Sequence, residues 1–261
     1  MQQRIILEAL RYSPCRFLYL ALLMANNYFQ FKQFTVQQDK CAMKVCTDAC
    51  LFGAYMANEL QQVAVKNILD IGTGTGLLSL LLAQKTTALI DAVEIDTAAF
   101  EQVKENIAQS PFKDRIEIFN ADISTFNFEK KYDCIISNPP FFEADLKSED
   151  EKKNAAKHDS ALTLDVLLHA IDTHLNAEGF FAVLLPYHRS NYFEAEATKL
   201  NFYLTKKILV MQTPKHNYFR VILIFSRKKT AVKEDEIIIK NEKGNYSTDF
   251  IDLLKDYYLH L

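Results

Sequence analysis

Three of the six glycines in this chain fall within five residues, as Gly72, Gly74 and Gly76, and this cluster constrains the fold more than any other feature. The short apolar run Asn67–Ile71 stands before the cluster, and the leucine-rich segment 77–85 follows it. Glycine permits backbone conformations and close ligand approaches that other residues resist. A strand, a glycine turn and a helix in this order predict a ligand site at the carboxyl edge of a parallel sheet.

From Lys66 onward, short apolar runs alternate with longer segments of helical period, which is typical of βα units in a parallel sheet. The apolar runs predict strands near 67–71, 89–94, 116–119, 132–137 and 180–185. The intervening segments predict helices near 76–85, 97–109, 161–175 and 189–199.

Two further apolar runs, 203–211 and 218–226, are separated by too few residues for a crossover helix, so we expect them to form an antiparallel hairpin. Gly179 is expected to end the helix that precedes the fifth strand. The predicted fold class is therefore α/β. We expect a Rossmann-like, seven-stranded and mostly parallel sheet with one antiparallel strand and helices on both faces.

Composition excludes several classes of protein. A net charge of −3 and a pI near 6.1 argue against affinity for polyanions over the whole surface, because non-specific phosphate binders usually carry a basic domain. Five cysteines without paired CxxC spacing favour neither a disulfide framework nor a zinc ribbon. We expect a reduced, cytoplasmic protein that holds no metal and has no membrane partner.

The first 25 residues combine Arg4, Arg11 and Arg16 with the apolar run 17–25. The segment has the outline of a short signal peptide but lacks a small-x-small cleavage site, and its apolar run is too short to span a bilayer. Another interpretation is that translation begins at Met24.

Acidic residues stand at the ends of three successive predicted strands. Asp70 stands just before the glycine turn, where it would repel a pyrophosphate and favour a cationic ligand. Glu94 closes the second strand, where a carboxylate can accept both hydroxyls of a ribose. Asp122, followed by Ile123, can accept from the exocyclic amine of an adenine. Together these acids indicate S-adenosylmethionine as cofactor, bound also by Gly72, Thr73, Gly74, Thr75 and Gly76.

The fourth predicted strand ends in Asn138, Pro139, Pro140 and Phe141, the most specific motif in the chain. Two consecutive prolines fix φ and remove two backbone donors, which leaves a rigid turn with outward carbonyl oxygens. The Asn138 side-chain oxygen and the Pro139 carbonyl can accept both hydrogens of one incoming amine. That geometry favours methylation of a planar amine, with Phe141 stacked on the target base.

On these motifs the chain resembles the class I S-adenosylmethionine-dependent N-methyltransferases that act on planar amines. Segments 31–34, 39–45 and 47–49 make it similar to the bacterial tRNA(Val) adenine-N6 methyltransferases, which modify the adenosine 3′ of the anticodon. Segments 106–111, 178–186 and 245–259 extend the resemblance over about residues 29–261. The resemblance implies three segments, namely an N-terminal extension at 1–28, a cofactor-lid segment at 29–65 and a catalytic domain at 66–261.

The resemblance also implies a tRNA substrate and cofactor contacts from Lys44 and Asp48. The sequence does not fix the oligomeric state, and we favour a monomer. Local cationic side chains are the candidates for RNA contact, and they are Lys152, Lys153, Lys157, Arg189, Lys215 and Arg220.

Three alternatives remain open from the sequence. The family often has tyrosine after the double proline, whereas Phe141 also occurs in related ribosomal-RNA guanine-N2 enzymes, which would change the target base. Protein-glutamine N5 methyltransferases share the chemistry but carry a sizeable helical domain ahead of the glycine turn, for which residues 29–66 are too few. A chain that only binds cofactor or RNA, without catalysis, is the non-enzymatic alternative.

Overall fold

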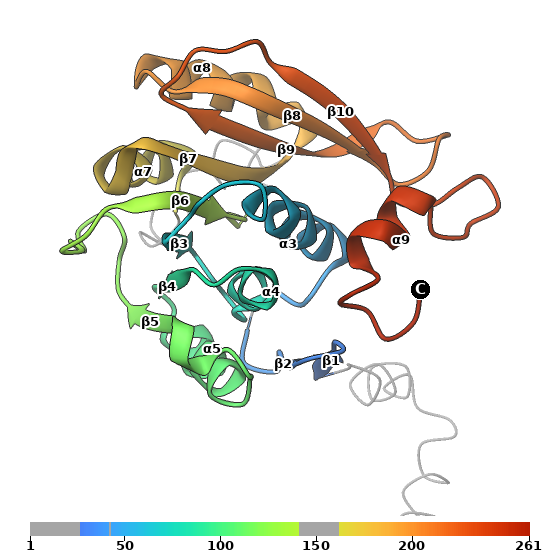
Figure 1. Cartoon of the computed structure of the whole chain (residues 1–261), viewed down its shortest axis with the longest axis horizontal. Helices are drawn as coiled ribbons and strands as arrows, with labels where there is room; N and C mark the ends of the chain where they lie inside the picture. Colours follow the sequence, from blue (N-terminus) through green and yellow to red (C-terminus); the bar gives the residue numbers. More distant parts are fainter. Residues whose placement is uncertain (1–26, 42, 141–161) are drawn as a thin grey trace, which may run out of the picture.

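The computed structural model describes residues 27–41, 43–140 and 162–261. Its main sheet has eight strands in the order β10-β8-β9-β7-β6-β3-β4-β5 (Figure 1). These strands are β3 (Asn67–Ile71), β4 (Leu89–Glu94), β5 (Ile116–Asn120), β6 (Tyr132–Ser137), β7 (Leu175–Pro186), β8 (Tyr203–Met211), β9 (Tyr218–Ser226) and β10 (Lys233–Ile238). A separate antiparallel hairpin joins β1 (Tyr28–Gln30) to β2 (Thr35–Gln37).

Helices cover both faces of the sheet, as the sequence predicts. One hydrophobic core lies under α3 (Thr47–Leu60), α4 (Leu77–Lys85), α5 (Thr97–Ala108) and α9 (Thr248–Leu254). The core of the other face lies under α7 (Leu164–His174) and α8 (Ser190–Lys199). Two short 3₁₀ turns complete the described elements, η1 (Lys113–Arg115) and η3 (Tyr187–Arg189).

Strand direction agrees with the predicted architecture, but the number of strands does not. Strand β9 is antiparallel to both neighbours, β7 and β8, and every other neighbouring pair in the main sheet is parallel. The predicted count of seven is wrong, because β10 adds an eighth strand beside β8. Its sequence Lys-Glu-Asp-Glu-Ile-Ile lacks alternation and is mostly exposed, which suits a charged edge strand.

Gly179 does not end a helix, contrary to expectation. Helix α7 ends at His174, and β7 begins at once at Leu175. The register between β6 and β7 shifts between Tyr132 and Cys134, so Gly179 lies in an irregular stretch of β7. A β-carbon at Gly179 would stand 3.0 Å from the carbonyl oxygen of Asp133. The glycine is therefore required by a close backbone approach between two strands.

The segment between the hairpin and β3 is part of the folded core. Helix α3 buries Cys50, Phe52 and Met56 against the residues of α4 and the sheet. Whether residues 29–65 also cover a cofactor stays a prediction.

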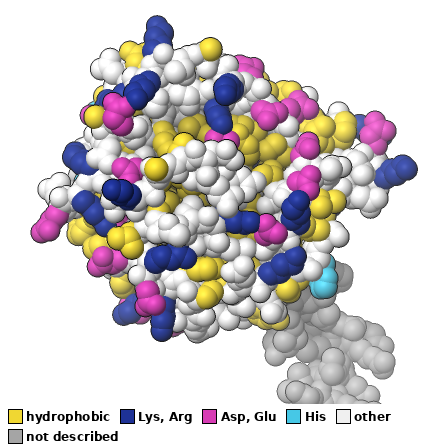
Figure 2. Space-filling model, viewed as in Figure 1, with side chains coloured by type: hydrophobic (Ala, Val, Ile, Leu, Met, Phe, Trp, Pro, Cys, Tyr) yellow, Lys and Arg dark blue, Asp and Glu magenta, His cyan; other side chains and the backbone are white. Residues whose placement is uncertain are grey.

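Figure 2 shows acidic and basic side chains interspersed over the face of the molecule that is drawn there. Contact of this face with an RNA therefore needs a local arrangement of side chains, because the face is not uniformly basic.

Candidate active site

The glycine turn between β3 and α4 adopts the left-handed backbone that its sequence predicts. Gly72, Gly74 and Gly76 have φ values of 70°, 57° and 82°. A β-carbon at Gly76 would lie 2.6 Å from Val103 of α5, so this glycine is also required by packing. A β-carbon at Gly74 would have no atom within 4 Å. The middle of the turn thus borders open space, where a ligand can approach the backbone.

Asp70 ends up wholly buried beneath this turn. Its Oδ2 accepts hydrogen bonds of 2.7 Å from the hydroxyls of Thr73 and Ser79, whereas Oδ1 has no hydrogen-bond partner within the described residues. Burial raises the pKa of the Asp70 carboxyl to about 6, and the two hydroxyls oppose that rise. A buried carboxylate with one unpaired oxygen fits a ligand that carries positive charge.

Glu94 is the last residue of β4 and Asp122 follows β5, as expected, but both side chains already accept hydrogen bonds from backbone N–H groups. Glu94 Oε2 accepts from the N–H of Gly74 at 2.8 Å, and Oε1 accepts from the N–H of Asp96 at 3.0 Å. Asp122 is exposed, and its Oδ1 accepts from the N–H of Ser124 at 2.8 Å. Because each carboxylate oxygen has two lone pairs, both side chains keep acceptor capacity for ribose or adenine groups.

The Asn138 motif lies beside the glycine turn. Ile71 and Ser137 are paired at the ends of β3 and β6, and the Ser137 hydroxyl donates to the Ile71 carbonyl at 2.8 Å. Asn138 is partly buried, Pro139 is buried and Pro140 is exposed. Within the described residues, the Asn138 side chain makes no hydrogen bond. Its amide therefore keeps its hydrogen-bonding capacity for groups outside these residues.

Asp48 and Arg220 form an ion pair of 2.7 Å at the same edge of the sheet. The sequence suggested separate partners for them, cofactor for Asp48 and RNA for Arg220. Asp48 lies in the first turn of α3, and Arg220 pairs with Pro186 at the end of β7. The ion pair therefore joins the first turn of α3 to β9 at the carboxyl end of β7.

The other sequence candidates are placed as follows. Lys44 is exposed ahead of α3, Lys215 is exposed in the turn between β8 and β9, and Ile123 is buried. Arg189 ends η3, with its guanidinium carbon 5.2 Å from the ring centre of Tyr192. Phe141, Lys152, Lys153 and Lys157 lie outside the described residues.

Asn106 of α5 supports the glycine turn through hydrogen bonds, and the sequence indicated no function for it. Its amide nitrogen donates to the carbonyl oxygens of Thr75 and Gln37, both at 2.9 Å, and its Oδ1 accepts from the N–H of Gln37 at 2.8 Å. The side chain thus holds the glycine turn against β2. The only sequence signal was its place in segment 106–111, which resembles the family.

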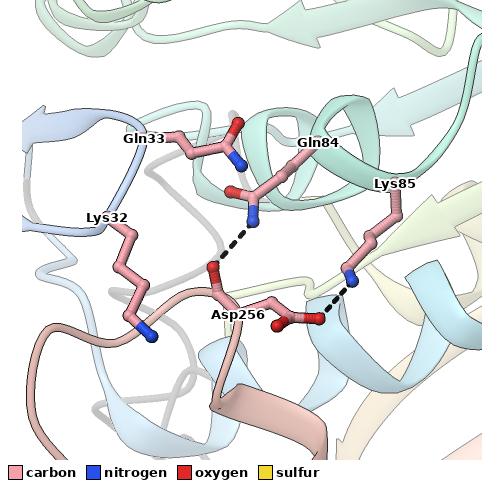
Figure 3. A pocket seen from close by; sticks show the side chains of 5 residues that line it. All are labelled: Lys32, Gln33, Gln84, Lys85 and Asp256. Carbon is pink, nitrogen blue, oxygen red and sulfur yellow. Dashed lines mark hydrogen bonds and ion pairs between the residues drawn. The ribbon is translucent and has the colours of Figure 1, made fainter.

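A hollow in the surface lies away from the glycine turn and the Asn138 motif (Figure 3). It is lined by Lys32 and Gln33 after β1, Gln84 and Lys85 at the end of α4, and Asp256 near the C-terminus. The Gln84 amide donates to the Asp256 carbonyl at 2.8 Å, and the Lys85 ammonium pairs with the Asp256 carboxylate. Because α4 begins at the glycine turn and ends here, this hollow is at the opposite end of the helix from the candidate site.

Two features are absent from residues 27–41, 43–140 and 162–261. No group of three or more His, Cys, Asp or Glu side chains in these ranges could hold a metal ion. No helix in the same ranges is long and apolar enough to cross a membrane.

Known proteins match this chain in family, sequence and fold. The model of the methyltransferase small domain family matches residues 52–166. The tRNA1(Val) (adenine(37)-N6)-methyltransferase of Dyadobacter fermentans is 45% identical over 239 residues, which cover 90% of this chain and 98% of the relative. The chain belongs to the family of the tRNA1(Val) (adenine(37)-N6)-methyltransferases. The relative of the same name from Bacteroides thetaiotaomicron is 40% identical over 91% of this chain and its own full length.

Solved structures agree on the fold. A predicted O-methyltransferase from Agrobacterium tumefaciens superposes with a TM-score of 0.62 at 15% identity, covering 80% of this chain and 96% of its own. A glycopeptide N-methyltransferase solved with (S)-adenosyl-L-methionine superposes with a TM-score of 0.51 at 13% identity, covering 68% of this chain and 88% of its own. The chain therefore has the class I methyltransferase fold, as the sequence predicts.

Proposed function

We propose that this chain transfers a methyl group from S-adenosylmethionine to the exocyclic N6 of an adenosine in tRNA, at position 37 of tRNA(Val), the position that the relatives' name gives. The observation that carries the proposal is the Asn138 motif at the end of β6, directly beside the glycine turn at the end of β3. The Asn138 motif is suited to a planar amine, and the glycine turn is suited to a cationic cofactor.

The cofactor-binding residues follow from the contacts at the glycine turn. S-adenosylmethionine supplies an activated methyl group on a positively charged sulfur. In our proposal, the unpaired Asp70 Oδ1 receives the ammonium of the cofactor's amino acid part. Glu94 accepts the ribose hydroxyls, and Asp122 accepts from the adenine amine. The backbone of residues 72–76 lines the approach, while Lys44 and Asp48 contribute from the segment before and at the start of α3.

The Asn138 motif positions the target amine. Its side-chain oxygen and the Pro139 carbonyl accept the two amine hydrogens, which draws the nitrogen from planar toward tetrahedral geometry and frees its lone pair. The Pro139 ring fixes its own φ and the following Pro140 restricts its ψ, so the turn holds the buried Pro139 carbonyl within a narrow range of directions. No strong base is required in this scheme, because the nitrogen–carbon bond would form as the methyl–sulfur bond breaks, with S-adenosylhomocysteine as the leaving product, and the nitrogen would then lose its proton to solvent.

The proposed function also includes contacts with the tRNA backbone, an oligomeric state and a location in the cell. Arg189, Lys215 and Arg220 are the described RNA candidates, and Lys152, Lys153 and Lys157 complete the set. We expect a monomer in the cytoplasm, where a reduced environment agrees with free Cys41, Cys46, Cys50 and Cys134.

The test is to incubate the protein with isotope-labelled S-adenosylmethionine and total tRNA that lacks this modification, then digest the tRNA and identify the labelled nucleoside by mass spectrometry. We expect N6-methyladenosine. Labelled N2-methylguanosine in ribosomal RNA offered in parallel would point to the guanine alternative. Labelled glutamine in an offered release factor would point to the protein alternative, and no transfer to any of these would overturn the proposal.

A further inference from the structure

We propose that Tyr187 and Tyr218 form an aromatic platform on which a nucleotide flanking the target adenosine stacks. This inference rests on the proposed function, because it names a part of the RNA-binding surface of the same site. Neither tyrosine belongs to the motifs that the sequence singled out.

The strand register places this platform beside the Asn138 motif. Ser137 at the end of β6 pairs with Val183 of β7, so the Asn138 turn continues alongside the last residues of β7. Tyr187 is the first residue after Pro186, where β7 ends. Adjacent strands lie about 4.8 Å apart and rise about 3.3 Å per residue, which puts Tyr187 roughly 10 Å from Asn138. That distance is suitable for a neighbour of a flipped-out base.

Tyr218 reaches the same place from the antiparallel strand. Pro186 pairs with Arg220 of β9, so Tyr218 lies beyond the end of β7 at the same carboxyl edge. The ring centres of Tyr187 and Tyr218 are 5.3 Å apart with an angle of 54° between the rings. Their contact makes one continuous aromatic surface rather than two isolated side chains.

The platform is both accessible and held in place. Tyr187 keeps 39% of its surface exposed, although an aromatic side chain of this size gains by burial. The Tyr218 hydroxyl donates to Glu236 Oε2 at 2.5 Å, and Glu236 belongs to β10. The unexpected eighth strand thereby fixes the orientation of one ring of the platform.

Charge around the two rings favours a nucleic acid over an apolar partner. Arg189 lies two residues after Tyr187, and Lys215 and His216 lie in the turn just before Tyr218. Two acids near this surface accept from tyrosine hydroxyls, Asp165 from Tyr192 and Glu236 from Tyr218, and Asp48 is paired with Arg220. Aromatic faces interleaved with cations are the pattern that binds single-stranded nucleotides, since every base can stack and every phosphate is negative.

The test measures RNA affinity separately from methyl transfer. A fluorescently labelled anticodon stem-loop of tRNA(Val) is titrated with the full chain and with the Tyr187→Leu and Tyr187→Leu/Tyr218→Leu variants, in the presence of S-adenosylhomocysteine. We expect the double variant to raise the RNA dissociation constant roughly 5- to 100-fold, the range for loss of base–aromatic stacking. Tyr187→Phe should bind within about twofold of wild type, because the ring face is kept.

Tyr203 offers a matched control. It begins β8 at the opposite edge of the sheet, is partly exposed, and has the Lys229 ammonium 5.7 Å from its ring centre. Tyr203→Leu should leave RNA affinity unchanged. The salt dependence adds a second control, because losing a stacking contact leaves the slope of log Kd against log salt unchanged, whereas Lys215→Gln should reduce that slope by about one.

A stem-loop with one abasic nucleotide next to the target identifies the stacked base. Removing that base should weaken binding to wild type but not to the double variant, so the two losses are not additive. The platform is overturned if wild type methylates tRNA while Tyr187→Leu and the double variant bind the stem-loop as tightly as wild type. A wild-type chain that methylates no tRNA overturns the proposed function itself, and it also overturns the platform, because the platform rests on that function.

Discussion

The Asn106 side chain donates a 2.9 Å hydrogen bond to the carbonyl oxygen of Thr75, in the middle of the glycine turn. The same amide group donates to and accepts from the backbone of Gln37 in β2. Asn106 is 1% exposed, so replacing it leaves these backbone groups buried without partners. One helix residue therefore links the N-terminal hairpin to the turn on which the cofactor is expected.

Asn106→Leu should lower the free energy of unfolding by about 1–3 kcal/mol, the cost of buried backbone groups that lose their partners. Cofactor affinity should fall as well, because the turn loses its support. Gln109→Leu is the control, since it removes an exposed amide near the end of the same helix. Denaturant unfolding and calorimetric titration with S-adenosylmethionine measure both effects. Equal stability of the two variants would show that the Asn106 bonds contribute nothing.

The buried Asp70 carboxyl should make cofactor affinity depend on pH. Its pKa of about 6 in the folded chain lies above the ordinary value of 3.8, mainly because of burial. A cationic ligand binds the carboxylate form, so affinity for S-adenosylmethionine should fall as the pH drops below about 6. Titrations between pH 5 and 8 measure this. Asp70→Asn should bind weakly at every pH, and an unchanged affinity in that variant would remove Asp70 from the cofactor site.

The same shift affects stability in the absence of ligand. Because the folded chain holds the Asp70 proton more tightly than the unfolded chain, this group's stabilisation is complete below pH 3.8 and is lost as pH rises through about 6. The free energy of unfolding of Asp70→Asn, measured relative to wild type, should therefore be higher above pH 6 than at low pH. Urea unfolding at pH 5 and pH 8 checks the sign, and the reverse trend would show that burial does not raise the pKa of Asp70.

The ion pair between Asp48 and Arg220 should act as a unit. Both side chains are mostly buried, with 14% and 28% of their surfaces exposed, so removing either partner leaves the other charge poorly solvated. Asp48→Asn and Arg220→Gln should each destabilise the fold. The double variant should lose less than the sum, with a coupling energy of about 0.5–3 kcal/mol in denaturant unfolding. Strict additivity would show that the pair does not join α3 to the sheet.

Asn138 should contribute to the rate and not to cofactor binding. If its oxygen holds the amine most strongly as the nitrogen becomes tetrahedral, Asn138→Ala should lower the single-turnover rate by about two to three orders of magnitude. The cofactor dissociation constant should barely change. A variant that keeps more than about a third of the wild-type rate with saturating RNA and cofactor would show that the motif is only a structural turn.

Periodicity predicted strands β3 to β9 because each of them is an apolar run of the right length. It missed β10, whose four charged residues Lys233–Glu236 do not alternate with apolar ones, and it misplaced Gly179, whose function depends on the distant Asp133. Local pattern carries information on burial along one segment, but not on which distant backbone a residue will approach.

The candidate site was predictable to the extent that it lies at strand ends. Parallel strands bring their carboxyl ends to one edge, so the sequence alone is enough to group Asp70, Glu94 and Asn138. The Asn106 bridge and the Asp48–Arg220 ion pair join segments that are far apart in sequence. Such contacts leave no spacing that a single sequence reveals.

Methyl transfer to a single nucleotide separates the proposed reaction from every alternative. Unmodified tRNA(Val) transcript and a transcript with guanosine at position 37 are each incubated with the protein and labelled S-adenosylmethionine, and the methyl groups per tRNA are counted. We predict one N6-methyladenosine per molecule of the first transcript and no transfer to the second. Equal transfer to both transcripts, or a label on any nucleoside other than adenosine, would contradict the proposed reaction.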